Sequence, residues 1–203
     1  MSLDELLARP GLSPEVRLLV AASVAIWRGD WPTLRACAAS ARARSVPRTR
    51  FEEALLQAVL FCGFPRVVTA FEHLTEAWPT PSPPAGGALP LPEQAAAASK
   101  LFAAIYGKNT TAVDAMLRSY HADFHAFVLE VAYGRILTRP GLTAAVRETI
   151  AVAVLAAQDQ VRQFAGHARG ALALGASKDE LRESVVTALG EEAAAAPWCA
   201  RIR

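Results

Sequence analysis

The chain has 203 residues, of which 53% are hydrophobic, so it can bury a sizeable core and is not expected to be disordered. Its 21 basic and 19 acidic residues are spread along the sequence and give a formal charge of +2, which argues against nucleic-acid binding. Three widely spaced cysteines without a C-x-x-C pair argue against a disulfide framework or a zinc site and favour a reducing cytoplasm. We recognise neither a secretion signal nor an apolar run of membrane-spanning length, so we expect a soluble cytoplasmic protein with no membrane contact.

Helical periodicity accounts for the chain on both sides of one proline-rich interruption. Alanine is abundant and long β-branched runs are scarce, which predicts an all-α fold of close-packed helices. Before the interruption, helices are expected at Pro14–Gly29, Trp31–Ser45, Pro47–Cys62 and Pro65–Trp78. The segment WPTPSPPAGGALPLP cannot continue either helix and predicts a linker. After it, helices are expected at Glu93–Gly107, Thr110–Tyr120, Asp123–Leu137, Thr143–Gln158, Gln160–Gly175 and Ser177–Leu189.

An internal repeat relates the two halves of the chain. A shift of 130 positions aligns Val16–Leu60 with Val146–Gly190 without a gap, with apolar positions on apolar positions and helix starts on helix starts. Each unit reads helix, turn, helix, turn, helix, and cannot bury its apolar face alone, so the two units are expected to pack on each other. This predicts a helical bundle of two tandem repeats, with a degenerate N-terminal repeat at 1–78, a linker at 79–92 and a C-terminal repeat at 93–203. A remaining apolar face would suit self-association into a homo-oligomer.

The second repeat carries an acid and a histidine in positions suited to chemistry. Glu148 lies near the start of one expected helix, and Gln160, Gln163 and His167 follow on the next at i, i+3 and i+7, which places them on one helix face. A carboxylate beside an imidazole raises its basicity and fixes its tautomer, as a general base requires. The alternative is that His167 is a hydrogen-bonded core histidine that braces two helices.

Two other features of the sequence receive a structural interpretation. His121 and His125 are spaced i, i+4, but two ligands alone are weak evidence, so a solvated helix face is preferred and no metal site is predicted. In the first repeat, Cys37 takes the position of His167 and Leu18 that of Glu148. That copy is therefore expected to be scaffold, with Cys37 a small buried hydrophobe; the alternative is a reactive Cys37.

The segment Asp123–Gly190 resembles the carboxymuconolactone decarboxylase family within the alkylhydroperoxidase D-like superfamily. The similarity includes FHAFVLEVAYGRILTRPGLTAAVRETIAVAVLAA and HARGALALGASKDELRESV. In the first repeat, FCGFP resembles the aromatic, Gly, Phe, Pro ending that follows the third helix in that family. The resemblance implies an all-helical, oligomeric fold whose active pocket lies between helices, often at a subunit interface.

Peroxidatic members of that superfamily carry a Glu, eleven residues, Cys, two residues, Cys, three residues and His. This chain keeps that spacing as Glu148, Gln160, Gln163 and His167, with glutamine at both cysteine positions. Thiol peroxidase chemistry needs a thiolate and a resolving thiol, and glutamine supplies neither. The resemblance therefore points to decarboxylase-type members, which also lack the cysteine pair.

By this resemblance, His167 would be the acid/base group, Glu148 or Glu130 its partner, and Tyr133 a hydrogen-bond donor to the substrate. Gln160 and Gln163 would contact the ligand, and Arg139 or Arg147 would hold a carboxylate. Each has a structural alternative: Arg147 recurs as Arg17 and would then pair with a neighbouring acid, and Tyr133 would then fill a packing seam.

These residues lead to the expectation of a protein that binds a small carboxylate or lactone metabolite and uses His167 without a cofactor. One alternative is an alkylhydroperoxidase-like antioxidant protein that uses Cys37. The other is a non-catalytic oligomeric interaction protein, which would seal Glu148 and His167 in a core with no adjoining pocket.

Overall fold

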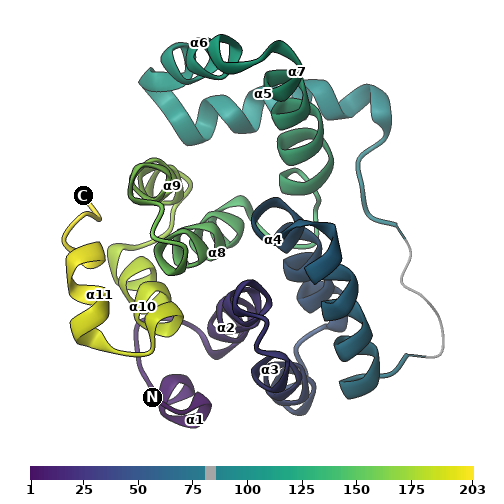
Figure 1. Ribbon diagram of the computed structural model, residues 1–203, viewed down its shortest axis with the longest axis vertical. Helices are drawn as coiled ribbons and strands as arrows, with labels where there is room; N and C mark the ends of the chain where they lie inside the picture. The colour runs from purple at the N-terminus through teal and green to yellow at the C-terminus, as the bar shows by residue number, and fades with distance from the viewer. Residues whose placement is uncertain (81–85) are drawn as a thin grey trace.

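The computed structural model describes residues 1–80 and 86–203, and within them it contains helices and no strand, which confirms the all-α fold (Figure 1). The first repeat contains α1 (Leu3–Leu7), α2 (Pro14–Arg28), α3 (Trp31–Ala43) and α4 (Arg48–Ala77). The middle segment contains α5 (Leu91–Tyr106), η1 (Gly107–Asn109), α6 (Thr110–Tyr120), α7 (Ala122–Phe127) and η2 (Val128–Leu137). The second repeat contains α8 (Ala144–Ala157), α9 (Val161–Ala173), α10 (Lys178–Leu189) and α11 (Glu192–Cys199).

Most of these helices lie where the periodicity predicts them, with three differences. The short helices α1 and α11 are not predicted by the sequence, and the single helix expected at Asp123–Leu137 is instead the α-helix α7 followed by the π-helical segment η2. The expected helices on either side of Gly63 run together as α4, with a break at that glycine. Part of the predicted linker, residues 81–85, lies outside the described residues.

The backbone conformation of the two halves matches at the turns as well as in the helices. Gly29 and Asp159, which are 130 positions apart, both adopt positive φ at 70° and 58°. Ser45 and Gly175, also 130 positions apart, do so at 57° and 99°. An Asp or a Ser rarely takes this conformation, so its occurrence at matched positions indicates that the two repeats share one backbone design.

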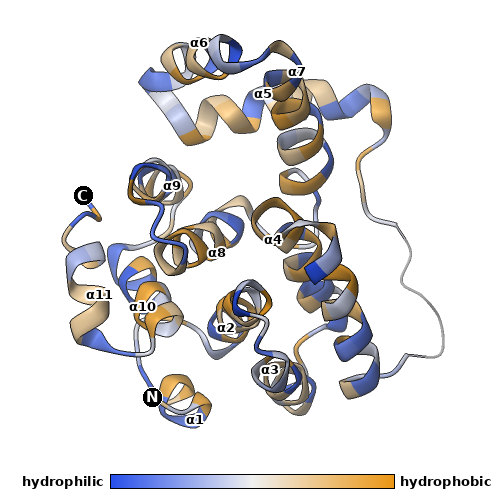
Figure 2. Ribbon diagram, viewed as in Figure 1, coloured by the Kyte–Doolittle hydropathy of each residue, from blue (hydrophilic) through white to orange (hydrophobic). Residues whose placement is uncertain are grey.

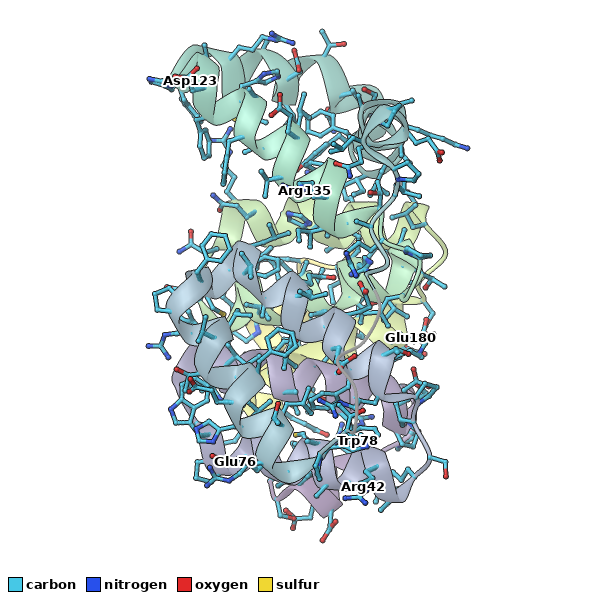
Figure 3. All side chains as sticks on the ribbon, turned by 90° about the vertical axis from the view of Figure 1, so that its right-hand side faces the viewer. Arg42, Glu76, Trp78, Asp123, Arg135 and Glu180 are labelled. Atoms are coloured by element: carbon cyan, nitrogen blue, oxygen red, sulfur yellow. The ribbon has the colours of Figure 1, made fainter. Side chains whose placement is uncertain are left out.

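The two repeats pack through their first helices, and a third group of helices stands to one side. Helices α2 and α8 are buried along most of their length and contact each other at the centre of the molecule (Figure 1). Helices α5, α6 and α7 with η2 form what we call the arm, which meets the body mainly through α9 and α4. The arm has a core of its own, made of Ala98, Phe102, Ile105, Tyr133 and Leu137. Figure 2 shows hydrophobic residues along α5 and along the helix that begins with α7, and Figure 3 shows the arm at one end of the molecule.

A buried arginine of the second repeat is neutralised by a glutamate of the first. Nη2 of Arg147 lies 2.7 Å from Oε2 of Glu53, and Nη2 of Arg139 lies 2.7 Å from Oε1 of the same carboxylate. The Arg147 side chain is 1% exposed, so its charge depends on this partner. Gly141 follows Arg139 closely, and a Cβ at that glycine would collide with the Glu53 side chain.

A matching set of ion pairs lies at the other side of the interface, with the arginines in the first repeat and the glutamate in the second. Arg17 and Arg9 of the first repeat bind Glu183 of the second, at 3.1 and 2.6 Å. A Cβ on Gly11, which corresponds to Gly141, would lie 3.0 Å from Cγ of Glu183. We call the two sets of ion pairs the reciprocal clasp. It extends the repeat from Val16 back at least to the Arg-Pro-Gly sequence of each unit.

Helix α4 is long and apolar enough to be considered as a membrane span, which the sequence does not lead us to expect. Its mean hydropathy reaches 1.6 over the best window, and 33% of that window is buried. Gly63, with φ 74° and ψ 168°, divides the helix into two parts, each shorter than the ~20 residues needed to cross a bilayer. Length and composition at α4 are therefore weak evidence for a span.

The reciprocal clasp predicts that Glu53→Gln lowers the free energy of unfolding by about 3–5 kcal/mol, because it leaves Arg147 buried without a carboxylate. Glu183→Gln is expected to be milder, since the Glu183 side chain is 16% exposed and that of Glu53 only 9%. Urea denaturation followed by circular dichroism measures both. Glu72→Gln, on an exposed position of α4, is the control, and a Glu53→Gln effect no larger than the control contradicts the structural role of the clasp.

The clasp also predicts a dependence of stability on pH. Burial alone would raise the pKa of Glu53, but hydrogen bonds from Arg139 and Arg147 outweigh it and hold the pKa below its ordinary value of 4.5. The hydrogen bond from Arg9 is the main cause that lowers the pKa of Glu183. A lowered carboxyl pKa stabilises the fold above the unfolded value, and this contribution is lost as the pH falls through the folded pKa.

Acid titration of the folded fraction is therefore expected to show a loss of stability that starts near pH 4.5 and continues below it. The Glu53→Gln variant lacks one of the two titrating groups, so its free energy of unfolding should fall less steeply over this range. Parallel acid dependences in the two proteins would exclude Glu53 as a source of the effect.

Candidate active site

Glu148 and His167 form a hydrogen-bonded pair between two neighbouring helices. Glu148 lies in the second turn of α8 and is 1% exposed, and His167 lies in the middle of α9. Oε2 of Glu148 is 2.7 Å from Nδ1 of His167, whose side chain is 17% exposed. The structure thus brings together the acid and the histidine that the sequence singles out, with the acid on the buried side.

The pair fixes the state of the imidazole. An ionised carboxylate only accepts hydrogen bonds, so Nδ1 of His167 carries the proton that is donated to Glu148, and Nε2 is the ring nitrogen left for a ligand. Burial by itself would lower the pKa of His167, but the charge and the hydrogen bond of Glu148 outweigh it and raise the pKa above 6.5. A more basic imidazole with a defined tautomer is suited to proton transfer.

A glycine allows this pair to sit close to the arm. A Cβ at Gly170, one turn after His167, would lie 2.7 Å from Cγ2 of Ile105 on α5 and 3.3 Å from Oε2 of Glu148. Any side chain at this position would push α5 away or displace the carboxylate. The absence of a side chain at Gly170 therefore sets the distance between α9, α5 and the acid.

A pocket of about 860 Å³ opens beside the histidine, between α9 and the arm. Its lining includes His167 and Gln163 from α9, Tyr106 from the end of α5, and side chains of α6 and α7. A volume of this size lies within the range of ~300–1,000 Å³ that is typical of ligand sites. His167 consequently has a buried carboxylate on one side and an accessible space on the other.

Two tyrosines connect the pocket with the arm's core. The hydroxyl of Tyr133 on η2 donates a hydrogen bond to that of Tyr106 at 3.0 Å, and the ring of Phe102 packs against both. Burial is the largest cause that raises the pKa of both hydroxyls, and that of Tyr133 is raised well above 10. Both remain neutral donors at physiological pH. Tyr133 is 3% exposed and does not line the pocket, whereas Tyr106 does.

Tyr106 lines the pocket, although the sequence does not single it out. No motif or spacing relates it to His167, because α5 lies far before α9 in the chain. Its proximity to the site depends on how the arm folds onto α9.

The other residues expected at the site lie elsewhere. Gln160 is the N-cap of α9, donates its side-chain amide to the Gln158 carbonyl at 3.2 Å and is outside the pocket lining. Glu130 is exposed on η2 and also lies outside the lining. Arg139 and Arg147 are bonded to Glu53 in the reciprocal clasp, and for Arg147 this is the arrangement that the ion-pair alternative expects. Their binding of a ligand remains a prediction.

The histidines at the end of the arm have partners within it. Nε2 of His125 lies 2.6 Å from Oδ1 of Asp114, and Nδ1 of His121 accepts a hydrogen bond from the backbone N–H of Asp123. Among residues 1–80 and 86–203, no group of three or more His, Cys, Asp or Glu side chains is placed to hold a metal ion.

The first repeat has no counterpart of this site. Cys37, at the position of His167, is 0% exposed, and burial, followed by the charge of Asp30, raises the pKa of its thiol to about 12. The second part of α4 covers α3, with His73 stacked on Trp31 at 5.2 Å and 2.9 Å from the Arg35 guanidinium. Where the second repeat keeps a pocket, the first is therefore filled by its own chain.

Sequence comparison identifies two curated relatives. Peroxisomal protein 2 of Schizosaccharomyces pombe is 29% identical over 144 residues, which cover 65% of this chain and 63% of the relative. The 4-carboxymuconolactone decarboxylase of Acinetobacter baylyi is 33% identical over 70 residues, which cover 34% of this chain and 52% of the relative. The chain thus spans between about half and two-thirds of the length of the relatives that it matches.

A family match covers a much larger part of the chain. It extends over residues 1–76 and 122–198, and so includes both repeats and leaves out the linker and the first part of the arm. The two matched segments are consistent with a duplication, as the backbone is. The protein belongs to the carboxymuconolactone decarboxylase family.

Proposed function

We propose that the second repeat binds a small carboxylate or lactone in the pocket beside His167 and acts on it by acid/base chemistry. The observation that carries this proposal is the position of the imidazole, which is hydrogen-bonded to buried Glu148 through Nδ1 and lines a pocket of about 860 Å³. Family membership and the distant likeness to a 4-carboxymuconolactone decarboxylase support the same class of chemistry.

The chemistry suited to this arrangement is proton transfer at a carbon next to a carbonyl group. Nε2 of neutral His167 removes the proton, and Glu148 stabilises the imidazolium that forms. Tyr106 accepts the hydrogen bond of Tyr133, so its own O–H is left to donate to an oxygen on which negative charge develops. In a decarboxylation, the imidazolium delivers its proton to the carbon from which CO₂ departs.

A thiol peroxidase mechanism has little support from the geometry. Gln160 and Gln163 hold the positions where peroxidatic members carry cysteine, and an amide cannot reduce a peroxide. With its pKa at about 12, Cys37 is ionised in on the order of one molecule in 10⁵ at pH 7, and it is closed off from solvent. A non-catalytic interaction protein would seal Glu148 and His167 in a core with no adjoining pocket, and the pocket beside His167 argues against that alternative.

The role of Glu148 predicts the titration of His167. In Glu148→Gln, burial remains while the carboxylate charge is lost, so the pKa of His167 should fall from above 6.5 to below it. NMR titration measures the shift, and the His167 resonance is assigned by its absence in His167→Gln. Glu130→Gln, on an exposed position, is the matched control and also tests the other partner that the resemblance implies. An unchanged His167 pKa in Glu148→Gln contradicts the pair.

The proposal predicts that His167→Gln lowers kcat for release of CO₂ from 4-carboxymuconolactone by about 10²–10⁴, the contribution of a positioned general acid or base. In the wild-type protein, kcat for CO₂ release should fall as the pH rises through a midpoint above 6.5, since the imidazolium is the form that donates the proton to carbon. Glu148→Gln should move this midpoint downward. Equal rates for wild type and His167→Gln would exclude catalysis by this residue.

The tyrosine pair predicts unequal effects for two similar substitutions. Tyr106→Phe removes the hydroxyl that lines the pocket and should lower kcat by about 10²–10³, as the loss of an oxyanion donor does. Tyr133→Phe removes a group that acts only through Tyr106, so its effect on kcat should be smaller with KM unchanged. Steady-state kinetics separate the two, and a larger effect of Tyr133→Phe would reverse the assignment.

A further inference from the structure

The pocket beside His167 is lined by positive charge without compensating acids. Arg162 and Arg169 of α9 and Lys108 of η1 belong to its lining, whereas no Asp or Glu does. In the described part of the chain none of the three forms an ion pair with a carboxylate, and Arg162 instead reaches Met116 on α6, with Nη2 2.7 Å from the sulfur. Three unpaired cations and an imidazole around one space favour an anionic ligand.

The wall opposite α9 is apolar and only partly covered by the protein, since Val113, Leu117 and Val128 pack in part against the arm's core. Val113, Met116 and Leu117 are spaced i, i+3 and i+4 on α6 and all line the pocket, and Phe124 and Val128 extend this surface along α7 and η2. None of the residues of α6 is buried, and Phe124 is 48% exposed. The apolar face of α6 is therefore turned toward the pocket and is only partly covered, which favours a ligand with an apolar body.

The size of the pocket adds a further constraint. Its volume of about 860 Å³ lies near the upper end of the ~300–1,000 Å³ that drug-sized ligands occupy. A lactone acid of about a dozen heavy atoms would leave much of the apolar wall in contact with water. A longer apolar body would remove that wall from water.

From these observations we infer that the pocket binds an aliphatic carboxylate of medium to long chain, with its chain on α6 and its charge at Arg162, Arg169 and Lys108. This inference rests on the proposed function in taking the pocket as the substrate site, and it narrows the substrate from small acids in general to acids with an extended hydrocarbon body. Carboxylate and phosphate ends share the required charge, so the probes include both.

Calorimetric titration of the full chain with hexanoate, octanoate, decanoate and dodecanoate tests the inference. Affinity should increase by about fourfold for each added CH₂ until the apolar wall is covered, since each buried methylene contributes ~0.8 kcal/mol. Dodecanol, which lacks the charge, should bind at least tenfold more weakly than dodecanoate. Dodecyl phosphate decides between the two anionic ends: binding tenfold tighter than that of dodecanoate would overturn the carboxylate assignment.

Variants separate the pocket from the rest of the surface. Arg162→Ala and Arg169→Ala should each weaken dodecanoate binding about tenfold and leave dodecanol unaffected, whereas Arg42→Ala, at an exposed position far from the arm in Figure 3, should change neither. Val113→Trp fills space beside α6 and should weaken dodecanoate binding more than hexanoate binding, and retained hexanoate binding shows that the variant is folded. Phe64→Ala removes the 68% exposed ring on α4 and should have no effect.

Affinity that does not depend on chain length, or dodecanoate binding that is lost in Phe64→Ala and kept in Val113→Trp, overturns the inference. So does binding to phosphatidylserine vesicles without binding of the monomeric acids. These failures are distinguishable from failure of the proposed function. If His167→Gln does not change CO₂ release but dodecanoate binds as expected, the catalytic role is wrong and the ligand class stands. If dodecanoate does not bind while His167→Gln abolishes turnover, the reverse holds.

Discussion

The rest of this structure depends on the neutralisation of two buried arginines, each by a glutamate of the other repeat. Arg147 is paired with Glu53 of the other repeat, and Arg17 with Glu183, so each repeat supplies the carboxylate that the other requires. A buried guanidinium without its partner is strongly destabilising, and in both pairs the carboxylate comes from the other repeat. The first repeat is thus indispensable to the fold although it carries neither the acid nor the histidine of the site.

The two repeats differ mainly in what covers their second helix. In the first, α4 continues past Gly63 and lies on α3, where it encloses Cys37. In the second, α10 ends at Gly190 and the arm covers α9 instead, which leaves space beside His167. One backbone design therefore yields a filled core in one copy and a pocket in the other. The local sequence of the repeat does not decide this; the helix that reaches over it does.

Features that depend on local spacing could be predicted from the sequence, and features that depend on distant segments could not. The helices of the repeats follow from their apolar periodicity, and the pairing of Glu148 with His167 could be expected from their places on two consecutive helices. Tyr106 could not be found this way, because the arm's docking brings it to the pocket. The partner of Arg147 could not be predicted from the sequence either. The recurrence of Arg-Pro-Gly at Arg9 and Arg139 does indicate that the two repeats share a feature there, which is the clasp.

The reciprocal clasp has the form of an isologous contact, in which position i of one unit meets position j of the other and j meets i. Contacts of this kind hold together homodimers with a two-fold axis, where every substitution appears twice and must suit both subunits. Joining the two units in one chain releases this requirement. The first repeat carries Leu18 and Cys37 where the second carries Glu148 and His167, so a symmetric interface supports a single asymmetric site.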